Sequence, residues 1–196
     1  MQSNSIMKAV LVVVLCVSLI TTGCTAQWIS VALADLPVLT QMALNIASLV
    51  ATLQSGREIN AGDAAAIQDI STEASKDLNL LQTLYNEYKS SPDAGTIGRI
   101  QSTITEINQN LPALLAAAHI SDAVLSARVT AGVNLILTTV QSFAALVPAN
   151  GVAAREAAQK LAVPKAKDLK KQWNQQVCSP TGNAAFDAAL AECVLK

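Results

Sequence analysis

The sequence contains few of the side chains that enzymes commonly use. Histidine occurs once in 196 residues, aromatic residues make up 3% and charged residues 14%. No Gly-x-Ser-x-Gly, phosphate-binding glycine loop, Cys-x-x-Cys or His-Glu-x-x-His motif is present. The one histidine, His119, lies between two apolar residues, which favours a capping or surface role over catalysis. An enzyme would have to assemble its site from distant residues, so the sequence predicts no enzyme, no catalytic residue and no cofactor.

Metal ligands are also scarce. Cys178, Cys193 and the distant His119 form an incomplete ligand set. The like-charged pair Glu73 and Asp77, four residues apart, could begin a metal site, but no histidine stands near it. We therefore predict no metal site, and we expect this pair to be solvated.

The net charge of −1 provides no global field that would attract nucleic acid. One stretch is locally basic and has only Glu156 and Asp168 as acids. Its cations are Arg155, Lys160, Lys165, Lys167, Lys170 and Lys171. The stretch is interpreted as a solvated helix face, with contact to anionic lipid headgroups as the functional alternative.

Glycine and proline are sparse, at 8 and 6 residues, and no strand-like alternation of polar and apolar residues is found. The apolar residues, 52% of the chain and rich in alanine, recur at spacings of three and four, which is typical of amphipathic helices. We predict an all-α fold: a four-helix bundle of long antiparallel helices with a short, disulfide-stapled helical C-terminal tail. The bundle is expected over 24–149, and the tail, packed on it, over 150–196.

The first helix is expected from Trp28 to Gly56, where Pro37 either starts the main helix, with Asp35 near its cap, or kinks a longer one. The second is expected from about Gly62 to Ser90. A third has one narrow apolar seam, and a kink or break is expected one turn upstream of Pro112. The seam consists of Ile97, Ile100, Ile104, Ile107, Leu111, Leu114 and Ala118. The fourth runs from about 121 to 147, with Ser121 the favoured cap.

The first and fourth helices lie in long stretches without charge, over 36–56 and 129–154. Each is long and apolar enough for a membrane span. Polar residues inside both stretches favour central helices of a water-soluble bundle instead.

The tail is predicted to contain short helices over 152–163, 165–177 and 184–193. Leu169, Trp173 and Val177 recur four apart on one face of the second of these. Cys178 and Cys193 are the cysteine pair that remains in an exported chain, and we predict a disulfide between them, worth about 3 kcal/mol in the chain-entropy model.

The N-terminus has the pattern of a secretory signal. Lys8 precedes an uncharged run, residues 9–20, that is too short to span a bilayer. The run ends at Ile20-Thr21-Thr22-Gly23-Cys24, which resembles the lipobox of bacterial lipoproteins, although Thr21 stands where leucine is usual. The resemblance covers residues 1–24 only and implies that 1–23 are removed and that Cys24 carries lipid. Thr25, rather than aspartate, favours an outer-membrane address facing the periplasm in a cell with two membranes. Trp28 is predicted either to lie at the membrane interface or to begin the core.

Three functional hypotheses remain open. The leading one is a non-enzymatic, membrane-anchored envelope lipoprotein that acts as a scaffold or binds an envelope protein, and does not bind nucleic acid. A second is a carrier of an apolar ligand in a slot between the first and fourth helices, lined by Leu39, Met42, Ile46, Ile136, Val140 and Phe143. A third is a membrane-inserting protein that uses those two helices as a hairpin.

Overall fold

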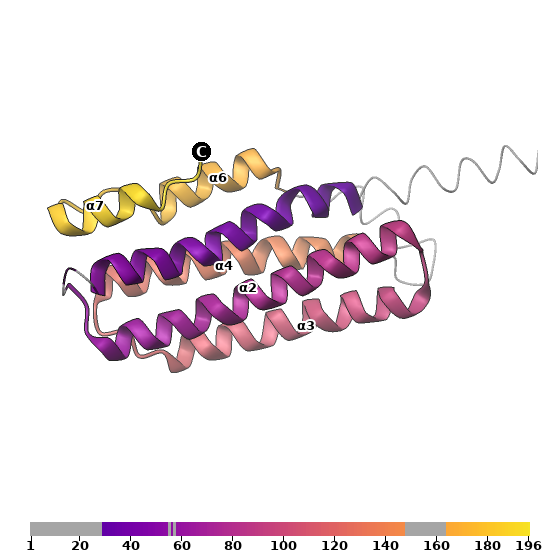
Figure 1. Ribbon diagram of the computed structural model, residues 1–196, viewed down its shortest axis with the longest axis horizontal. Helices are drawn as coiled ribbons and strands as arrows, with labels where there is room; N and C mark the ends of the chain where they lie inside the picture. The colour runs from indigo at the N-terminus through magenta and orange to yellow at the C-terminus, as the bar shows by residue number, and fades with distance from the viewer. Residues whose placement is uncertain (1–28, 55, 57, 148–163) are drawn as a thin grey trace, which may run out of the picture.

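The computed structural model describes residues 29–54, 56, 58–147 and 164–196 (Figure 1). The first helix spans Ile29–Gln54. It is followed by α2 (Ala61–Ser90), α3 (Ala94–Ala117), α4 (Ala123–Leu146), α6 (Ala166–Gln176) and α7 (Ala184–Glu192). These ranges contain no strand, so the predicted all-α fold of four long helices and a short helical tail is confirmed. The helix expected over 152–163, Trp28 and Cys24 lie outside the described residues.

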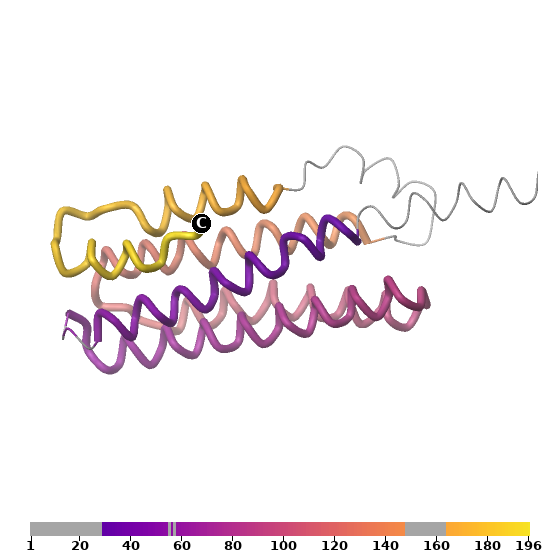
Figure 2. Tube along the Cα trace, turned by 45° about the horizontal axis from the view of Figure 1, so that its top comes forward, coloured from indigo at the N-terminus to yellow at the C-terminus, as the bar shows by residue number. Residues whose placement is uncertain are grey.

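The four long helices lie side by side and alternate in direction, and the tail, here residues 164–196, covers the first helix and α4 (Figures 1 and 2). The start of the first helix and the α2–α3 turn therefore lie at the same end of the molecule, which we call the N-terminal end, whereas α6 begins short of that end and runs away from it. Leu169, Trp173 and Val177 are at most 1% exposed, so the predicted inner face of α6 is confirmed.

Short polar side chains cap most of the described helices. The side chains of Asn60, Asp93, Asp122 and Asn183 each accept a hydrogen bond from a backbone N–H in the first turn of the helix that follows. The prediction that Ser121 caps α4 is wrong, because its backbone N–H and hydroxyl both donate to Asp63, at 2.9 and 2.7 Å. The next residue, Asp122, is then left to cap the helix.

Both helix prolines lie inside continuous helices. The first helix passes through Pro37, which excludes a helix start there and makes Asp35 an interior residue rather than its cap. Of the kink or break expected one turn upstream of Pro112, the break is excluded, since α3 is continuous from Ala94 to Ala117. Both rings are exposed, while buried leucines beside them hold the helices against the core. Packing therefore compensates for the lost backbone hydrogen bonds.

The first helix and α4, which contain the long uncharged stretches, meet in the bundle interior. Both are long and apolar enough to cross a membrane, and half of each apolar window is buried inside the protein. The ring of Phe143 on α4 lies edge-on to that of Tyr85 on α2, with centroids 6.3 Å apart. Thr138, Thr139 and Ser142 hydrogen-bond to carbonyl groups of α4 itself. These hydroxyls are satisfied without neighbouring helices, so they argue less strongly against a span than the sequence suggests.

One expected surface charge is buried. Asp77 is only 5% exposed, whereas its predicted partner Glu73 is partly exposed and bonds Lys76 at 3.2 Å. Desolvation and the charge of Glu73 raise the pKa of Asp77. The expectation that this pair is solvated is therefore wrong for Asp77, because the α2–α3 interface covers more of α2 than its apolar positions alone imply.

Candidate functional site

The seam between the tail and the bundle is joined by a disulfide and by hydrogen bonds from several helices. The carbonyl oxygen of Cys193 accepts two hydrogen bonds, from the indole N–H of Trp173 on α6 and from the side-chain amide of Asn45 on the first helix, both at 2.8 Å. Cys193 is also joined to Cys178, with Cα atoms 6.1 Å apart, which confirms the predicted disulfide. One residue near the end of the tail thus links α6, α7 and the first helix.

Trp173 is fully buried, and α4 makes room for it with a glycine. A Cβ at Gly132 would lie 3.0 Å from Cζ3 of Trp173 and 3.3 Å from Cδ1 of Ile46. Alanine at position 132 would therefore require the Trp173 ring and the Ile46 side chain to shift by a few tenths of an ångström, and a larger residue would require more. The close approach of α4 to α6 therefore depends on this glycine.

The far end of α6 is tied to α4 by Arg128. Its guanidinium donates to the carbonyl oxygen of Gln176 at 3.0 Å and to the hydroxyl of Ser179. A cation at a helix C-terminus satisfies a free carbonyl group and interacts favourably with the helix dipole. In the next loop, hydrogen bonds from Thr181 and Gly182 hold the pKa of Asp187 below its usual range.

The first turn of α6 is capped by a residue of the first helix. Lys165 occupies the N-cap position without a side-chain hydrogen bond, and the backbone N–H of Ala166 instead donates to the carboxyl group of Asp35. Asp35 is 1% exposed, and its Oδ2 atom has no hydrogen-bond partner. Desolvation outweighs the hydrogen bond and raises the pKa of Asp35 to about 6. A buried carboxyl group that charges near pH 6 therefore lies where the tail begins.

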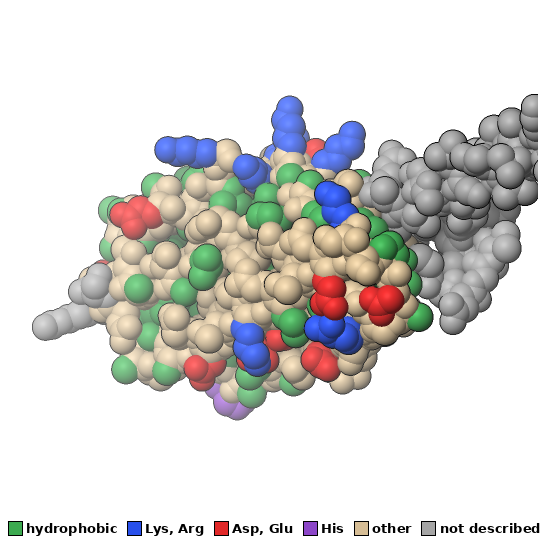
Figure 3. All heavy atoms as spheres, turned by 45° about the vertical axis from the view of Figure 1, so that its right-hand side comes forward, with side chains coloured by type: hydrophobic (Ala, Val, Ile, Leu, Met, Phe, Trp, Pro, Cys, Tyr) green, Lys and Arg blue, Asp and Glu red, His purple; other side chains and the backbone are tan. Residues whose placement is uncertain are grey.

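The outer face of α6 is basic. Lys165, Lys167 and Lys171 are exposed, and Lys170 donates to the main-chain oxygen of Lys196 at 2.6 Å. Figure 3 shows cationic side chains gathered along the upper edge of the molecule, over this helix. The ion pairs found among the described residues, Lys76–Glu73 and Arg99–Glu87, involve none of these lysines.

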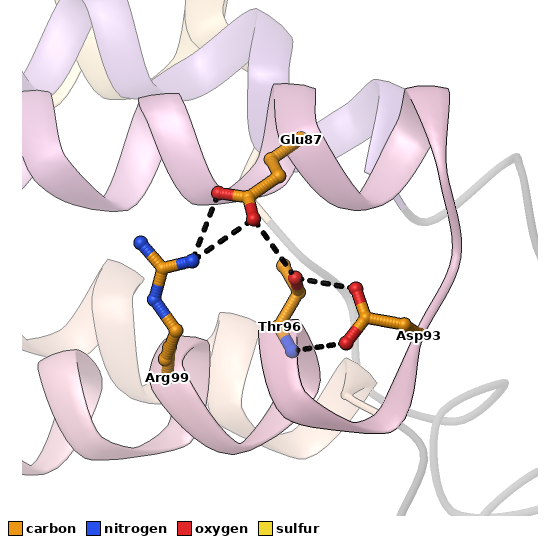
Figure 4. A network of polar contacts seen from close by, with 4 residues as sticks. All are labelled: Glu87, Asp93, Thr96 and Arg99. Atoms are coloured by element: carbon orange, nitrogen blue, oxygen red, sulfur yellow. Dashed lines mark hydrogen bonds and ion pairs between the residues drawn. The ribbon is translucent and has the colours of Figure 1, made fainter.

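Charges at the nearby α2–α3 turn are paired instead (Figure 4). Arg99 bonds both carboxylate oxygens of Glu87, at 2.9 and 3.1 Å. The hydroxyl and backbone N–H of Thr96 donate to Asp93, which lowers the pKa of that carboxyl group. This network joins α2 to α3, whereas no ion pair among the described residues involves Lys165, Lys167 or Lys171 of the tail.

The six residues predicted to line an apolar slot lie in the buried core. Each is at most 1% exposed; they are Leu39, Met42, Ile46, Ile136, Val140 and Phe143. A hollow of about 200 Å³ lies elsewhere, where the end of the first helix meets the start of α2, and none of the six lines it. Its lining is Val50, Ala51, Gln54, Ala61, Ala64, Ala65 and Gln68.

His119 occupies the turn between α3 and α4. It is exposed and has a φ of 34°, in the left-handed region often found just after a helix. Over the described ranges, no three His, Cys, Asp or Glu side chains are grouped so that they could hold a metal ion. Comparisons with protein families, with curated proteins and with solved structures find no match to this chain.

Proposed function

We propose that this protein is an exported lipoprotein in which lipid on Cys24 holds a non-enzymatic helical domain at an envelope membrane. The observation that carries the proposal is the signal-like run that ends at Gly23-Cys24. The disulfide between Cys178 and Cys193 supports export, because such bonds persist in oxidising compartments.

The described part of the fold lies close to Cys24 in sequence. The first described helical residue, Ile29, is five residues after Cys24. Five residues reach at most about 18 Å when fully extended. A lipid on Cys24 would therefore keep the N-terminal end of the bundle close to the bilayer, where the domain acts as a scaffold or binds another envelope protein.

Cys24→Ser tests the anchor. Metabolic labelling with a radioactive fatty acid is expected to mark the wild-type chain and to leave Cys24→Ser unlabelled, unprocessed or released from the membrane. Cys16→Ser is the matched control, because Cys16 lies inside the apolar run and should not affect labelling. Equal labelling of Cys24→Ser and wild type would disprove the anchor.

A membrane-inserting hairpin is the second candidate, favoured by the two span-length apolar helices. The two candidate functions predict different solubility for a chain that lacks the signal and the lipid. A chain that begins at Thr25 is expected to remain in aqueous buffer if the bundle is the working state, and to require detergent if the hairpin inserts.

A further inference from the structure

We propose that the exposed lysine face of α6 is a docking surface for anionic phospholipid, so that the anchored domain lies with the tail against the bilayer. The inference rests on the proposed lipid anchor, which brings the domain to a membrane, but it concerns a different surface of the molecule. The surface consists of Lys165, Lys167 and Lys171, with Lys170 beside them.

The charge of this helix sets it apart from the rest of the chain. Four lysines and Asp168 give residues 165–171 a net charge of +3, whereas the whole chain carries −1. Lys167 and Lys171 are four residues apart on the exposed side of α6, opposite the buried Leu169 and Trp173. Like charges at this spacing repel each other and weaken a helix. The repulsion is relieved when the face meets negative charge.

The position of α6 places this face near the anchor. The first turn of α6 is hydrogen-bonded to Asp35, which is only eleven residues after Cys24. Figures 1 and 2 show α6 on the outside of the molecule, where it runs along the first helix and away from the N-terminal end. A tether at that end allows the outer side of α6 to reach the bilayer.

The seam contacts make α6 a rigid platform for these lysines. The indole N–H of Trp173 donates to the carbonyl oxygen of Cys193, and the guanidinium of Arg128 donates to the carbonyl oxygen of Gln176 at the C-terminal end of the helix. The lysine face is therefore presented without a need to order the helix on binding, and a membrane is the flat, multivalent anionic surface that it fits.

The test uses the processed protein, purified from its own envelope and reconstituted in vesicles. Lysine acetylation is followed residue by residue by mass spectrometry, with vesicles of phosphatidylcholine alone or mixed with phosphatidylglycerol. In the anionic vesicles, Lys165, Lys167 and Lys171 are expected to be protected, and 1 M salt is expected to remove the protection. Lys76 and Lys89, which lie on α2, are expected to react equally in both.

Two double variants distinguish the effect of lost positive charge from a folding defect. Lys167→Gln with Lys171→Gln should reduce the protection of Lys165, by about fivefold for each charge removed. Lys76→Gln with Lys89→Gln is the matched control and should leave that protection unchanged. Both pairs are exposed, and unchanged melting temperatures would exclude a folding defect.

Two outcomes discriminate between this inference and the anchor. If the protein stays on both kinds of vesicle and its α6 lysines react equally in both, the anchor holds and the docking surface is wrong. If the protein does not stay on phosphatidylcholine but binds anionic vesicles with the α6 lysines protected, the anchor is wrong and the docking surface holds.

Discussion

The interior of the four-helix bundle and the seam between bundle and tail are stabilised by different forces. In the interior, apolar side chains such as Leu39, Ile46 and Ile136 pack against each other, and the hydroxyls of α4 bond their own helix. At the seam, a disulfide and hydrogen bonds from Trp173 and Asn45 meet at Cys193. The tail also buries apolar residues such as Leu169 and Phe186 in the same core, but far fewer than the four long helices do. The tail should therefore open more easily than the bundle.

The largest effect is expected from a charge in the bundle interior. Ile136 is fully buried, so Ile136→Asp should unfold a chain that begins at Thr25, with a loss of more than about 4 kcal/mol. Asn134→Asp, on the exposed side of the same helix, should change stability by less than about 0.5 kcal/mol. Far-UV circular dichroism during urea unfolding measures both variants. Normal folding of Ile136→Asp would count against a soluble bundle.

Breaking the disulfide should open the tail and spare the bundle. Removing Cys178–Cys193 with a reductant, or by paired serine substitutions, should cost about 3 kcal/mol. Trypsin cleavage at the lysines of α6 should then become about 100-fold faster, while cleavage at Lys76 on α2 stays unchanged. Equal acceleration at both places would mean that bundle and tail unfold as one unit.

A pH titration should separate the Asp35 contact from the rest of the seam. Because burial raises its pKa to about 6, Asp35 binds a proton more tightly in the folded than in the unfolded state. Its contribution is fully favourable below about pH 4 and is lost as the pH rises through 6, a change of about 3 kcal/mol.

The variant Asp35→Asn should remove this part of the pH dependence and be at least as stable as wild type at pH 7. Asp93→Asn is the opposite control. The folded-state pKa of Asp93 is lowered, so its stabilisation is lost on acidification instead. Urea unfolding at a series of pH values measures both. Parallel curves for Asp35→Asn and wild type would contradict the burial of a titrating carboxyl group.

Two glycine substitutions should give the smallest effects, of opposite sign. Gly98→Ala on α3 meets no atom within 4 Å and should stabilise the bundle by about 1 kcal/mol through helix propensity. Gly132→Ala would crowd Trp173 and should destabilise the seam by about 1 kcal/mol. Thermal melts distinguish them, and a stabilised Gly132→Ala would show that α6 can move outward without cost.

The helices were predictable because their signals are local. Apolar residues at spacings of three and four marked each long helix within a few residues of its bounds, and the cysteine pair of an exported chain indicated the disulfide. The caps were less certain. Ser121 and Asp122 are both good caps by residue type, and only the contact of Ser121 with Asp63, distant in sequence, decides between them.

Some properties of the candidate surfaces could likewise be predicted from the sequence, and others depend on the fold. The basic character of residues 165–171 and the lipobox-like Cys24 can be read directly from the sequence, because charge and short motifs need no fold. That the lysines of α6 point outward follows from the burial of Leu169 and Trp173 and from the docking of the tail along the first helix. The predicted lining residues of the apolar slot show what the sequence cannot supply. Their periodicity identifies them as inward-facing, but periodicity carries no information about how closely two helices approach.

The sequence alone determined the helical class, the long helices, the disulfide partners and the apolar character of the first and fourth helices, because each depends on neighbours along the chain. Only the tertiary structure decided the role of Asp35, the burial of Asp77 and the need for glycine at position 132. Each of these depends on the distance between side chains of different helices. Burial and interhelical contact, rather than residue type, make Asp35 a cap for α6 with a pKa near 6, although the sequence suggests a cap for its own helix.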